Sequence, residues 1–293
     1  MPYTAQITRT SPACVLLLVD QSRSMDHPFA GTGTQSKAAA VADAVNRLLQ
    51  NLILRSAKAD GVRDYFHVGV IGYGSEVRSG LRGRVLSNVL VPISQLADDP
   101  IRVESRTRLT PDGNGGVQTK TIKFPVWYDP EAAGQTPMCQ ALHLAAHTAR
   151  VFAGTYPNSF PPLVLNMTDG KPTDGDPAGK AWLVRMVSTN DGNALLFNTL
   201  LSVAPIPPAF FPDAEEQLAD PFAQALFRMS SVLPPRMCDA ARAEGYAVRG
   251  AARGVVVNAD PIALVRFLDI GTRVSAGGGG AVVAPPPGSE ARP

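Results

Sequence analysis

The sequence CVLLLVDQSRSM, residues 14–25, joins a continuous apolar run to a polar segment. An apolar run of this kind, rich in Leu and Val, is typical of a strand buried on both faces of a parallel sheet. The polar segment then places a carboxylate and two hydroxyls, those of Asp20, Ser22 and Ser24, at alternate positions. Such an oxygen-rich cluster suits a hard divalent cation. The stretch therefore predicts a buried strand with a metal site at its carboxyl end.

Composition argues against several classes of function. The chain has 293 residues, a net charge of +2 and 45% hydrophobic residues, which allows a sizeable core. No stripe of Lys and Arg interleaved with aromatics occurs, so we expect no nucleic-acid binding. Residues 1–12 lack the apolar core of a secretory signal and no segment has transmembrane length, so we expect a cytoplasmic location without membrane contact. Three widely spaced cysteines in apolar patterns, Cys14, Cys139 and Cys238, are predicted to be reduced core thiols.

Apolar runs and amphipathic segments alternate along the chain. Strands are expected at residues 14–19, 66–73, 163–167, 194–202 and 254–258, and helices at 36–53, 136–153, 178–188, within 213–244, and at 261–270. Ser36 and Thr136 are each predicted to cap a helix, with Pro137 at the first helical position. The alternation predicts an α/β fold with a doubly wound, mostly parallel sheet flanked by helices.

Residues 81–128 interrupt this rhythm. A short strand is expected at 86–93, and two alternating runs, 101–109 and 119–127, flank a turn-rich linker and predict a β-hairpin. Basic residues on both arms indicate a solvated ribbon beside the main sheet, and a partner-binding surface is the alternative. The predicted organisation is an N-terminal extension at 1–12, one domain at 13–273 with a hairpin insertion at about 81–128, and a disordered Gly/Pro-rich tail at 274–293.

Polar residues from three loops are predicted to meet at one edge of this sheet. Ligands in doubly wound folds bind beyond the carboxyl ends of the strands, where the strand order reverses. The segment from Asp20 to Ser24, together with Thr136 and Asp169, is expected there. Helix amino termini at that edge favour anions, so the two carboxylates are what would make the crevice attractive to a cation.

The three segments carry a resemblance. Residues 20–25 (DQSRSM), 134–138 (GQTPM) and 167–174 (MTDGKPTD) resemble, in order and spacing, the three parts of the metal-ion-dependent adhesion site of von Willebrand factor A (VWA) domains. The resemblance covers about residues 13–273 and implies a Rossmann-like fold.

The ligand set follows from the resemblance, position by position. It implies that Ser22, Ser24 and Thr136 supply hydroxyl ligands to Mg²⁺, with Mn²⁺ or Ca²⁺ as alternatives. Asp20 and Asp169 would act through coordinated water or by direct contact. It further implies that a partner protein's Asp or Glu completes the coordination, so that the chain is a binding module and not an enzyme.

Arg23 stands where many relatives have glycine. Either the position needs positive φ, which would strain an arginine, or Arg23 points outward and pairs with the incoming partner carboxylate. The chain also resembles bacterial cytoplasmic members of the family, of the tellurite-resistance TerY type, in three features: Trp127-Tyr128, the hairpin insertion and the ending at 267–272. That placement implies a stress-response or phosphosignalling system, with a kinase and phosphatase, or a MoxR-type ATPase, encoded nearby.

Two other functions compete with a binding module. A divalent-metal-dependent hydrolase acting on phosphate esters would need a general base, and His27 is the histidine close to the predicted site. A scaffold with a degenerate site is the third reading. Nucleotide binding is not expected, because residues 31–37 have Ser36 where a phosphate loop needs glycine, and the residue that follows them is Ala38 where Ser or Thr is needed.

Overall fold

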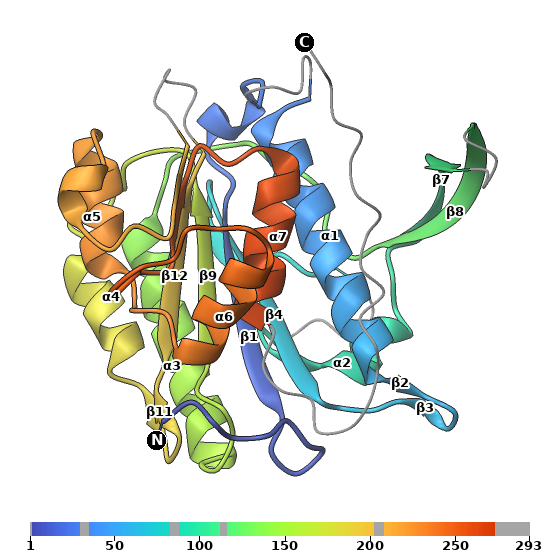
Figure 1. Cartoon of the computed structure of the whole chain (residues 1–293), viewed down its shortest axis with the longest axis horizontal. Helices are drawn as coiled ribbons and strands as arrows, with labels where there is room; N and C mark the ends of the chain where they lie inside the picture. Colours follow the sequence, from blue (N-terminus) through green and yellow to red (C-terminus); the bar gives the residue numbers. More distant parts are fainter. Residues whose placement is uncertain (1, 30–34, 83–87, 112–115, 202–207, 273–293) are drawn as a thin grey trace.

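The computed structural model describes residues 2–29, 35–82, 88–111, 116–201 and 208–272. One eight-stranded sheet lies at its centre (Figure 1). The strands are β1 (Ala13–Asp20), β4 (Phe66–Tyr73), β5 (Val77–Ser79), β6 (Val91–Pro92), β9 (Leu163–Thr168), β12 (Leu195–Leu200), β13 (Ala209–Phe210) and β14 (Val255–Val257). Their order is β13-β14-β12-β9-β1-β4-β5, with β6 also paired to β4. The five strands from β14 to β4 are parallel, and β5, β6 and β13 are antiparallel additions.

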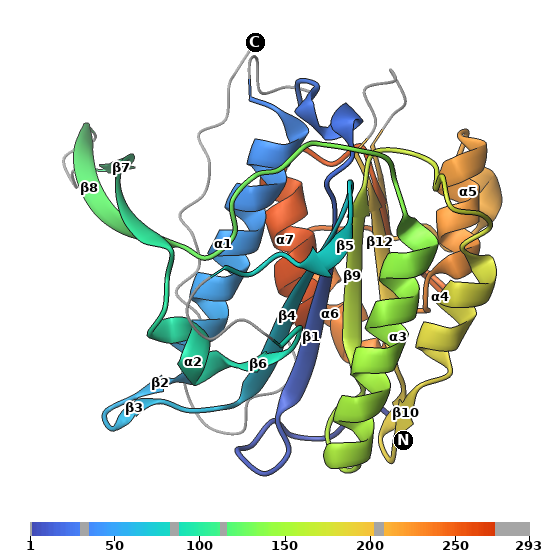
Figure 2. The same ribbon diagram turned by 180° about the vertical axis from the view of Figure 1, so that it is seen from behind.

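Helices cover both faces of the sheet (Figures 1 and 2). One face carries α1 (Lys37–Ser56), α2 (Ile93–Ala97), α6 (Pro235–Ala243) and α7 (Pro261–Thr272), and the other carries α3 (Met138–Thr155), α4 (Ala178–Arg185) and α5 (Pro221–Met229). Two short 3₁₀ turns, η1 (Arg23–Asp26) and η2 (Glu215–Gln217), complete the helical elements of the described residues. The predicted α/β class with a mostly parallel, helix-flanked sheet is confirmed.

The first strand is buried on both faces, as expected from its continuous apolar run. Alternate side chains enter different layers of the core: Leu17 packs beneath α1, whereas Leu16 and Leu18 pack beneath α3. The neighbouring strand β4 lets other segments approach closely, because a β-carbon at Gly69 would lie 2.4 Å from the carbonyl oxygen of Val89. All eight residues of β1 are buried, and the strand lies between β9 and β4 in the sheet.

The two alternating runs pair with each other as an antiparallel ribbon, β7 (Arg102–Pro111) and β8 (Val117–Val126), which projects from the main body (Figure 1). Arg106 of β7 attaches the ribbon to α1, because its guanidinium lies 2.9 Å from the carboxylate of Asp43. The same guanidinium lies 3.7 Å above the ring of Phe124 in β8. Residues 112–115 at the turn lie outside the described residues, as do residues 86 and 87 of the strand expected at 86–93. Only Val91–Pro92 of that expectation is seen as a strand.

Smaller features complete the fold. Two short hairpins occur, β2 (Ala57–Lys58) with β3 (Gly61–Val62), and β10 (Ser188–Thr189) with β11 (Gly192–Asn193). The second one shortens the helix expected at 178–188, which ends at Arg185 because residues 188–189 pair with 192–193. The predicted disordered tail lies outside the described residues. None of the described helices combines the length and apolarity needed to cross a membrane.

Candidate metal centre

The first and third parts of the predicted site leave the sheet at the same edge. β1 and β9 are adjacent and parallel, with Val19 opposite Met167, so the residues that follow them lie side by side. The chain passes from β1 to β4 on one side and later returns to β9 on the other. The strand order therefore reverses at this point, which is where ligands bind in doubly wound sheets.

Hydrogen bonds join four of the five predicted ligands. Ser22 Oγ lies 3.0 Å from Ser24 Oγ, and Ser24 Oγ donates to Asp169 Oδ1 at 2.7 Å. Asp20 Oδ1 accepts from the backbone amide of Ser22 at 2.8 Å, while its Oδ2 accepts from the hydroxyl of Thr168 at 2.7 Å. The alternation of Asp, Ser and Ser in the sequence thus places all three side chains in one cluster with Asp169.

The loop that carries Thr136 is held against both of the others. The backbone amide of Arg23 donates to the Gly134 carbonyl at 3.3 Å. The amide of Thr136 donates to Thr173 Oγ1 at 3.1 Å, and the amide of Thr173 donates back to the Thr136 carbonyl at 3.0 Å. Thr136 is 5% exposed. The three predicted segments therefore converge.

The predicted helix cap at Thr136 is wrong. The helix α3 begins at Met138, Pro137 occupies the N-cap position, and no side chain at that position caps the helix. The carboxylate of Asp174 instead accepts hydrogen bonds from the amides of Cys139 and Gln140, at 3.0 and 2.9 Å. Because proline has no side-chain acceptor, the cap comes from another loop. The hydroxyl of Thr136 is therefore not used as a helix cap.

The two carboxylates of the cluster differ in their electrostatic surroundings. Asp20 is fully buried, and among the described residues it forms no ion pair. Burial raises the pKa of Asp20 to about 6, against the lowering effect of the hydrogen bonds from Ser22 and Thr168, and the nearby charge of Asp169 raises it further. Asp169 has a cation beside it, because Lys37 Nζ lies 2.7 Å from its Oδ2. Lys37 was not among the predicted site residues.

The donor set fits a hard cation. The clustered side chains offer only hydroxyl and carboxylate oxygens, which are the ligands that Mg²⁺ prefers, and the buried carboxylate of Asp20 lacks a compensating charge. No group of three or more His, Cys, Asp or Glu side chains that could hold a metal is found in the described part of the chain. A metal at this edge would consequently depend on the hydroxyls as well as on the two carboxylates.

Two exposed residues flank the cluster. Arg23 lies in η1 and is not among the described residues with positive φ, so the strained-backbone alternative for this position is wrong. His27, on which the hydrolase alternative depends, follows η1 and is also exposed. Its backbone amide donates to the Ser24 carbonyl at 3.1 Å. Both residues are near the cluster in the chain, and neither is part of its hydrogen-bonded core.

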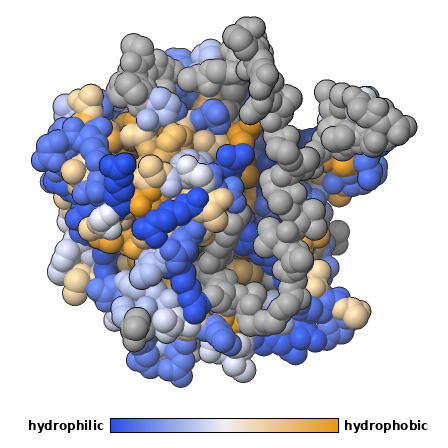
Figure 3. All heavy atoms as spheres, viewed as in Figure 1, coloured by the Kyte–Doolittle hydropathy of each residue, from blue (hydrophilic) through white to orange (hydrophobic). Residues whose placement is uncertain are grey.

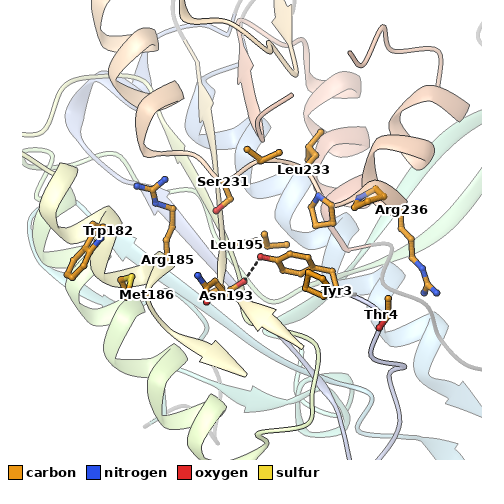
Figure 4. Close-up of a pocket in the computed structure, with 15 residues that line it drawn as sticks. Tyr3, Thr4, Trp182, Arg185, Met186, Asn193, Leu195, Ser231, Leu233 and Arg236 are labelled. Atoms are coloured by element: carbon orange, nitrogen blue, oxygen red, sulfur yellow. Dashed lines mark hydrogen bonds between the residues drawn. The ribbon is translucent and has the colours of Figure 1, made fainter. Parts of the chain in front are cut away.

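A separate cavity of about 710 Å³ lies where β12 begins (Figure 4). This is the end of the sheet opposite the cluster, because β12 runs parallel to β9 and the cluster follows the carboxyl ends of β1 and β9. It is bounded by the N-terminal segment, the end of α4 and residues 231–236. Tyr3 closes one side by donating a hydrogen bond to the Asn193 carbonyl at 3.2 Å. Trp182 and Met186 are exposed beside it. On the face shown in Figure 3, apolar and strongly hydrophilic surface are interspersed around α5 and α6. No predicted site residue lines this cavity.

Comparison with known proteins finds matches among solved structures. No protein-family model and no curated protein matches the chain. Among solved structures, proximal thread matrix protein 1 from the mussel byssus is 12% identical, with a TM-score of 0.46, over 92% of this chain and 49% of that one. The pilus adhesin SpaC from Lactobacillus rhamnosus GG is 13% identical, with a TM-score of 0.47, over 92% of this chain and 32% of that one.

A third match is the vWF domain of the type V pili tip protein Mfa5 from Porphyromonas gingivalis, 13% identical, with a TM-score of 0.30, over 55% of this chain and 39% of that one. The chain spans about half the length of the mussel protein and about a third of the pilus adhesin. These similarities assign no role to any residue. The chain is an α/β protein with a mostly parallel, helix-flanked sheet, and its solved neighbours include one described as a vWF domain.

Proposed function

We propose that this chain is a Mg²⁺-dependent protein-binding domain of the VWA type, without enzymatic activity, in which a partner's Asp or Glu completes the metal coordination. One observation carries the proposal: Ser22, Ser24 and Asp169 are joined by hydrogen bonds beside a fully buried Asp20 that has no cationic partner among the described residues. A cluster of buried oxygens with uncompensated negative charge is what a hard cation stabilises.

The residues divide the work between coordination and charge. Ser22, Ser24 and Thr136 would hold the ion through their hydroxyls, and Asp20 and Asp169 would balance its charge. The bound ion would supply a Lewis-acidic position for an incoming carboxylate, since Mg²⁺ in proteins usually keeps some exchangeable ligands. Arg23, exposed at the rim, would guide that carboxylate by a charge-assisted contact.

The proposed setting is the bacterial cytoplasm, in a stress-response or phosphosignalling system. The three-part sequence motif supports the family, and the three cysteines support a reducing compartment. Cys14, Cys139 and Cys238 are all buried, and none forms a disulfide. Identification of a kinase, phosphatase or MoxR-type ATPase as the partner would support this setting.

Calorimetric titration of Mg²⁺ tests the metal site. We expect Thr136→Ala to weaken Mg²⁺ binding by tenfold or more, because a direct ligand is lost. Thr155→Ala is a matched control, because Thr155 is the last residue of α3, the helix that follows Thr136, and its hydroxyl donates to the Val151 carbonyl of the same helix at 3.0 Å. Equal Mg²⁺ affinity in all three proteins would refute the site.

Partner binding tests the function. Affinity purification in Mg²⁺ and in EDTA, followed by surface plasmon resonance with each recovered protein, should give a complex that EDTA dissociates. Replacement of one partner Asp or Glu by Ala should abolish that complex. A partner that binds equally well in EDTA and to Thr136→Ala would rule out metal-mediated recognition while leaving the fold unaffected.

The non-enzymatic part of the proposal has its own test. Hydrolysis of p-nitrophenyl phosphate in Mg²⁺ or Mn²⁺ should stay at the level of buffer alone. Metal-dependent hydrolysis that is lost in His27→Ala would favour the hydrolase function, since a general base is what that reaction needs.

A further inference from the structure

The one cation inside the predicted site, as far as the chain is described, is a lysine side chain. Lys37 is the first residue of α1 and is 3% exposed, and the Asp169 side chain that it contacts is fully buried. The ammonium group lies 2.7 Å from Asp169 Oδ2 and 3.5 Å from the Ser24 carbonyl. Asp169 Oδ1 is used by Ser24. Both oxygens of this carboxylate are therefore occupied by donors of the chain itself.

The backbone presets the position of Lys37. Ser36 caps α1, with its Oγ accepting from the Ala39 amide at 3.2 Å, and the Lys37 amide donates to the His27 carbonyl at 3.0 Å. The lysine is thus fixed at the start of a helix whose N-terminus follows the loop of Asp20. These bonds fix the backbone of Lys37, whereas its long side chain still loses rotamer freedom when it is buried against Asp169.

The contact between Lys37 and Asp169 affects both stability and metal affinity, because both of its partners are charged. A buried ion pair that loses one partner leaves an uncompensated charge in the protein interior, which is strongly destabilising. Asp169 would be such a charge in the metal-free chain if Lys37 were absent. With Lys37 present, the two carboxylates and the ammonium carry a net charge of −1 instead of −2, so a divalent ion is attracted less strongly.

We propose that Lys37 is a tethered cation that compensates Asp169 in the metal-free chain and competes with a divalent ion for that carboxylate. The inference rests on the proposed metal site and adds a form of regulation to it. The loops stay assembled without the metal, and the metal binds more weakly than two uncompensated carboxylates would allow. Binding and release of the ion then change partner affinity without unfolding the edge of the sheet.

Replacement of Lys37 by methionine tests the inference, because methionine has a similar length and no charge. Thermal unfolding is measured in EDTA and in about 5 mM MgCl₂, a concentration chosen to exceed the expected dissociation constant. We expect Mg²⁺ to raise the wild-type melting temperature by less than it raises that of Lys37→Met. Lys37→Met should melt lower in EDTA and regain about 5 °C or more in Mg²⁺. Calorimetry should show at least tenfold tighter Mg²⁺ binding by Lys37→Met.

Two further variants separate charge compensation from packing. Lys171→Met removes an exposed lysine from the loop of Asp169 and should behave as the wild type. The double variant Lys37→Met/Asp169→Asn removes both charges, so it should regain stability in EDTA and show no response to Mg²⁺. A double variant as unstable in EDTA as Lys37→Met would mean that lost packing, and not charge, is responsible, and would overturn the inference.

Mg²⁺ titration of the wild type separates the remaining outcomes from failure of the proposed function, because a wild type that binds no Mg²⁺ refutes the metal site itself. If Lys37→Met is destabilised in EDTA and Mg²⁺ does not restore it, Lys37 is a structural ion-pair partner and the inference is overturned. If the wild type gains as much from Mg²⁺ as the variant, there is no competition and the inference is again overturned. If Lys37→Met shows the expected switch while the partner complex resists EDTA, the inference stands and metal-mediated recognition fails.

Discussion

The carboxylate of Asp174 accepts a hydrogen bond from the backbone amide of Gln140 at 2.9 Å and a second one from Cys139 at 3.0 Å. The acceptor belongs to the loop after β9 and the donors to the first turn of α3. Unsatisfied amides and a positive dipole end occur at every helix N-terminus. The Asp174 carboxylate accepts hydrogen bonds from two of these amides, and its negative charge interacts favourably with the positive end of the helix dipole. It thereby connects the loop that follows Asp169 to the helix that follows Thr136.

Loss of this cap should destabilise the fold and loosen the predicted site. We expect Asp174→Ala to lower the free energy of unfolding by about 1 kcal/mol, the usual cost of an N-cap deletion. Urea denaturation measures it. Asp174→Asn keeps an acceptor oxygen and should recover part of the loss. If Asp174→Ala unfolds at the same urea concentration as the wild type, the two hydrogen bonds do not contribute to stability.

Gly134 should tolerate no side chain. Its φ is +84°, and an added β-carbon would lie 2.4 Å from the backbone nitrogen of Ser75. Gly134→Ala should therefore cost about 1–3 kcal/mol from backbone strain alone, and it should weaken Mg²⁺ binding because the loop of Thr136 must move. Gly154→Ala is the control: Gly154 is in α3 with open space around it, so alanine there should be neutral or slightly stabilising. Equal stability of the two variants would contradict this.

Arg23 should affect partner binding separately from metal binding. Its exposed guanidinium lies beside the cluster in the chain and is not part of the hydrogen-bonded core. Arg23→Ala should weaken binding of a carboxylate-bearing partner by about tenfold, a typical effect of losing a charge-assisted contact. Mg²⁺ affinity, measured by calorimetry on the free chain, should not change. Parallel losses of both affinities would assign Arg23 to the metal site instead.

His67 should make stability depend on pH. Its ring packs 5.7 Å from the Phe152 ring and 5.3 Å from the Tyr156 ring, and burial lowers its pKa, with Asp64 acting in the opposite direction. The unfolded chain then binds a proton at a higher pH than the folded chain does. Stability contributed by neutral His67 is present above the unfolded pKa of about 6.5 and is lost as pH falls below it.

The measurement for His67 is the urea midpoint between about pH 7.5 and pH 5. His67→Gln should show a smaller decrease across this window than the wild type. His143→Gln changes a histidine on the exposed side of α3 and should keep the wild-type slope. Identical pH profiles of the wild type and His67→Gln would show that His67 is not responsible.

Features that depend on local sequence were predictable. The strand expected at 66–73 has the bounds of β4, and Ser36 caps α1 as its position before the apolar stripe indicated. Convergence of the three site segments was also predictable. It follows from strand alternation and the edge rule for parallel sheets, and needs no knowledge of side-chain positions.

Features that depend on distant contacts were missed. Lys37 stood out only as part of a failed phosphate loop, because its partner Asp169 is 132 positions away. Thr136 had the residue type of a helix cap, but the acceptor Asp174 lies 35 positions from the amide that it binds. A hydroxyl or lysine side chain that contacts a residue far away in the sequence has the same neighbouring residues as one that caps its own helix or faces solvent. Spacing along the sequence therefore does not distinguish distant contacts from local ones.

The hydrogen bond from Ser24 to Asp169 joins residues 145 positions apart. Contacts of such separation form late, because a long loop must close before they contribute any stability. During synthesis the segment around Ser22 emerges well before β9, so the cluster that Ser24 forms with Asp169 stays incomplete until that strand is added next to β1. For the proposed metal-mediated binding, we therefore expect only a chain with a closed sheet to be competent, and we expect a truncated or half-folded chain not to compete for the partner.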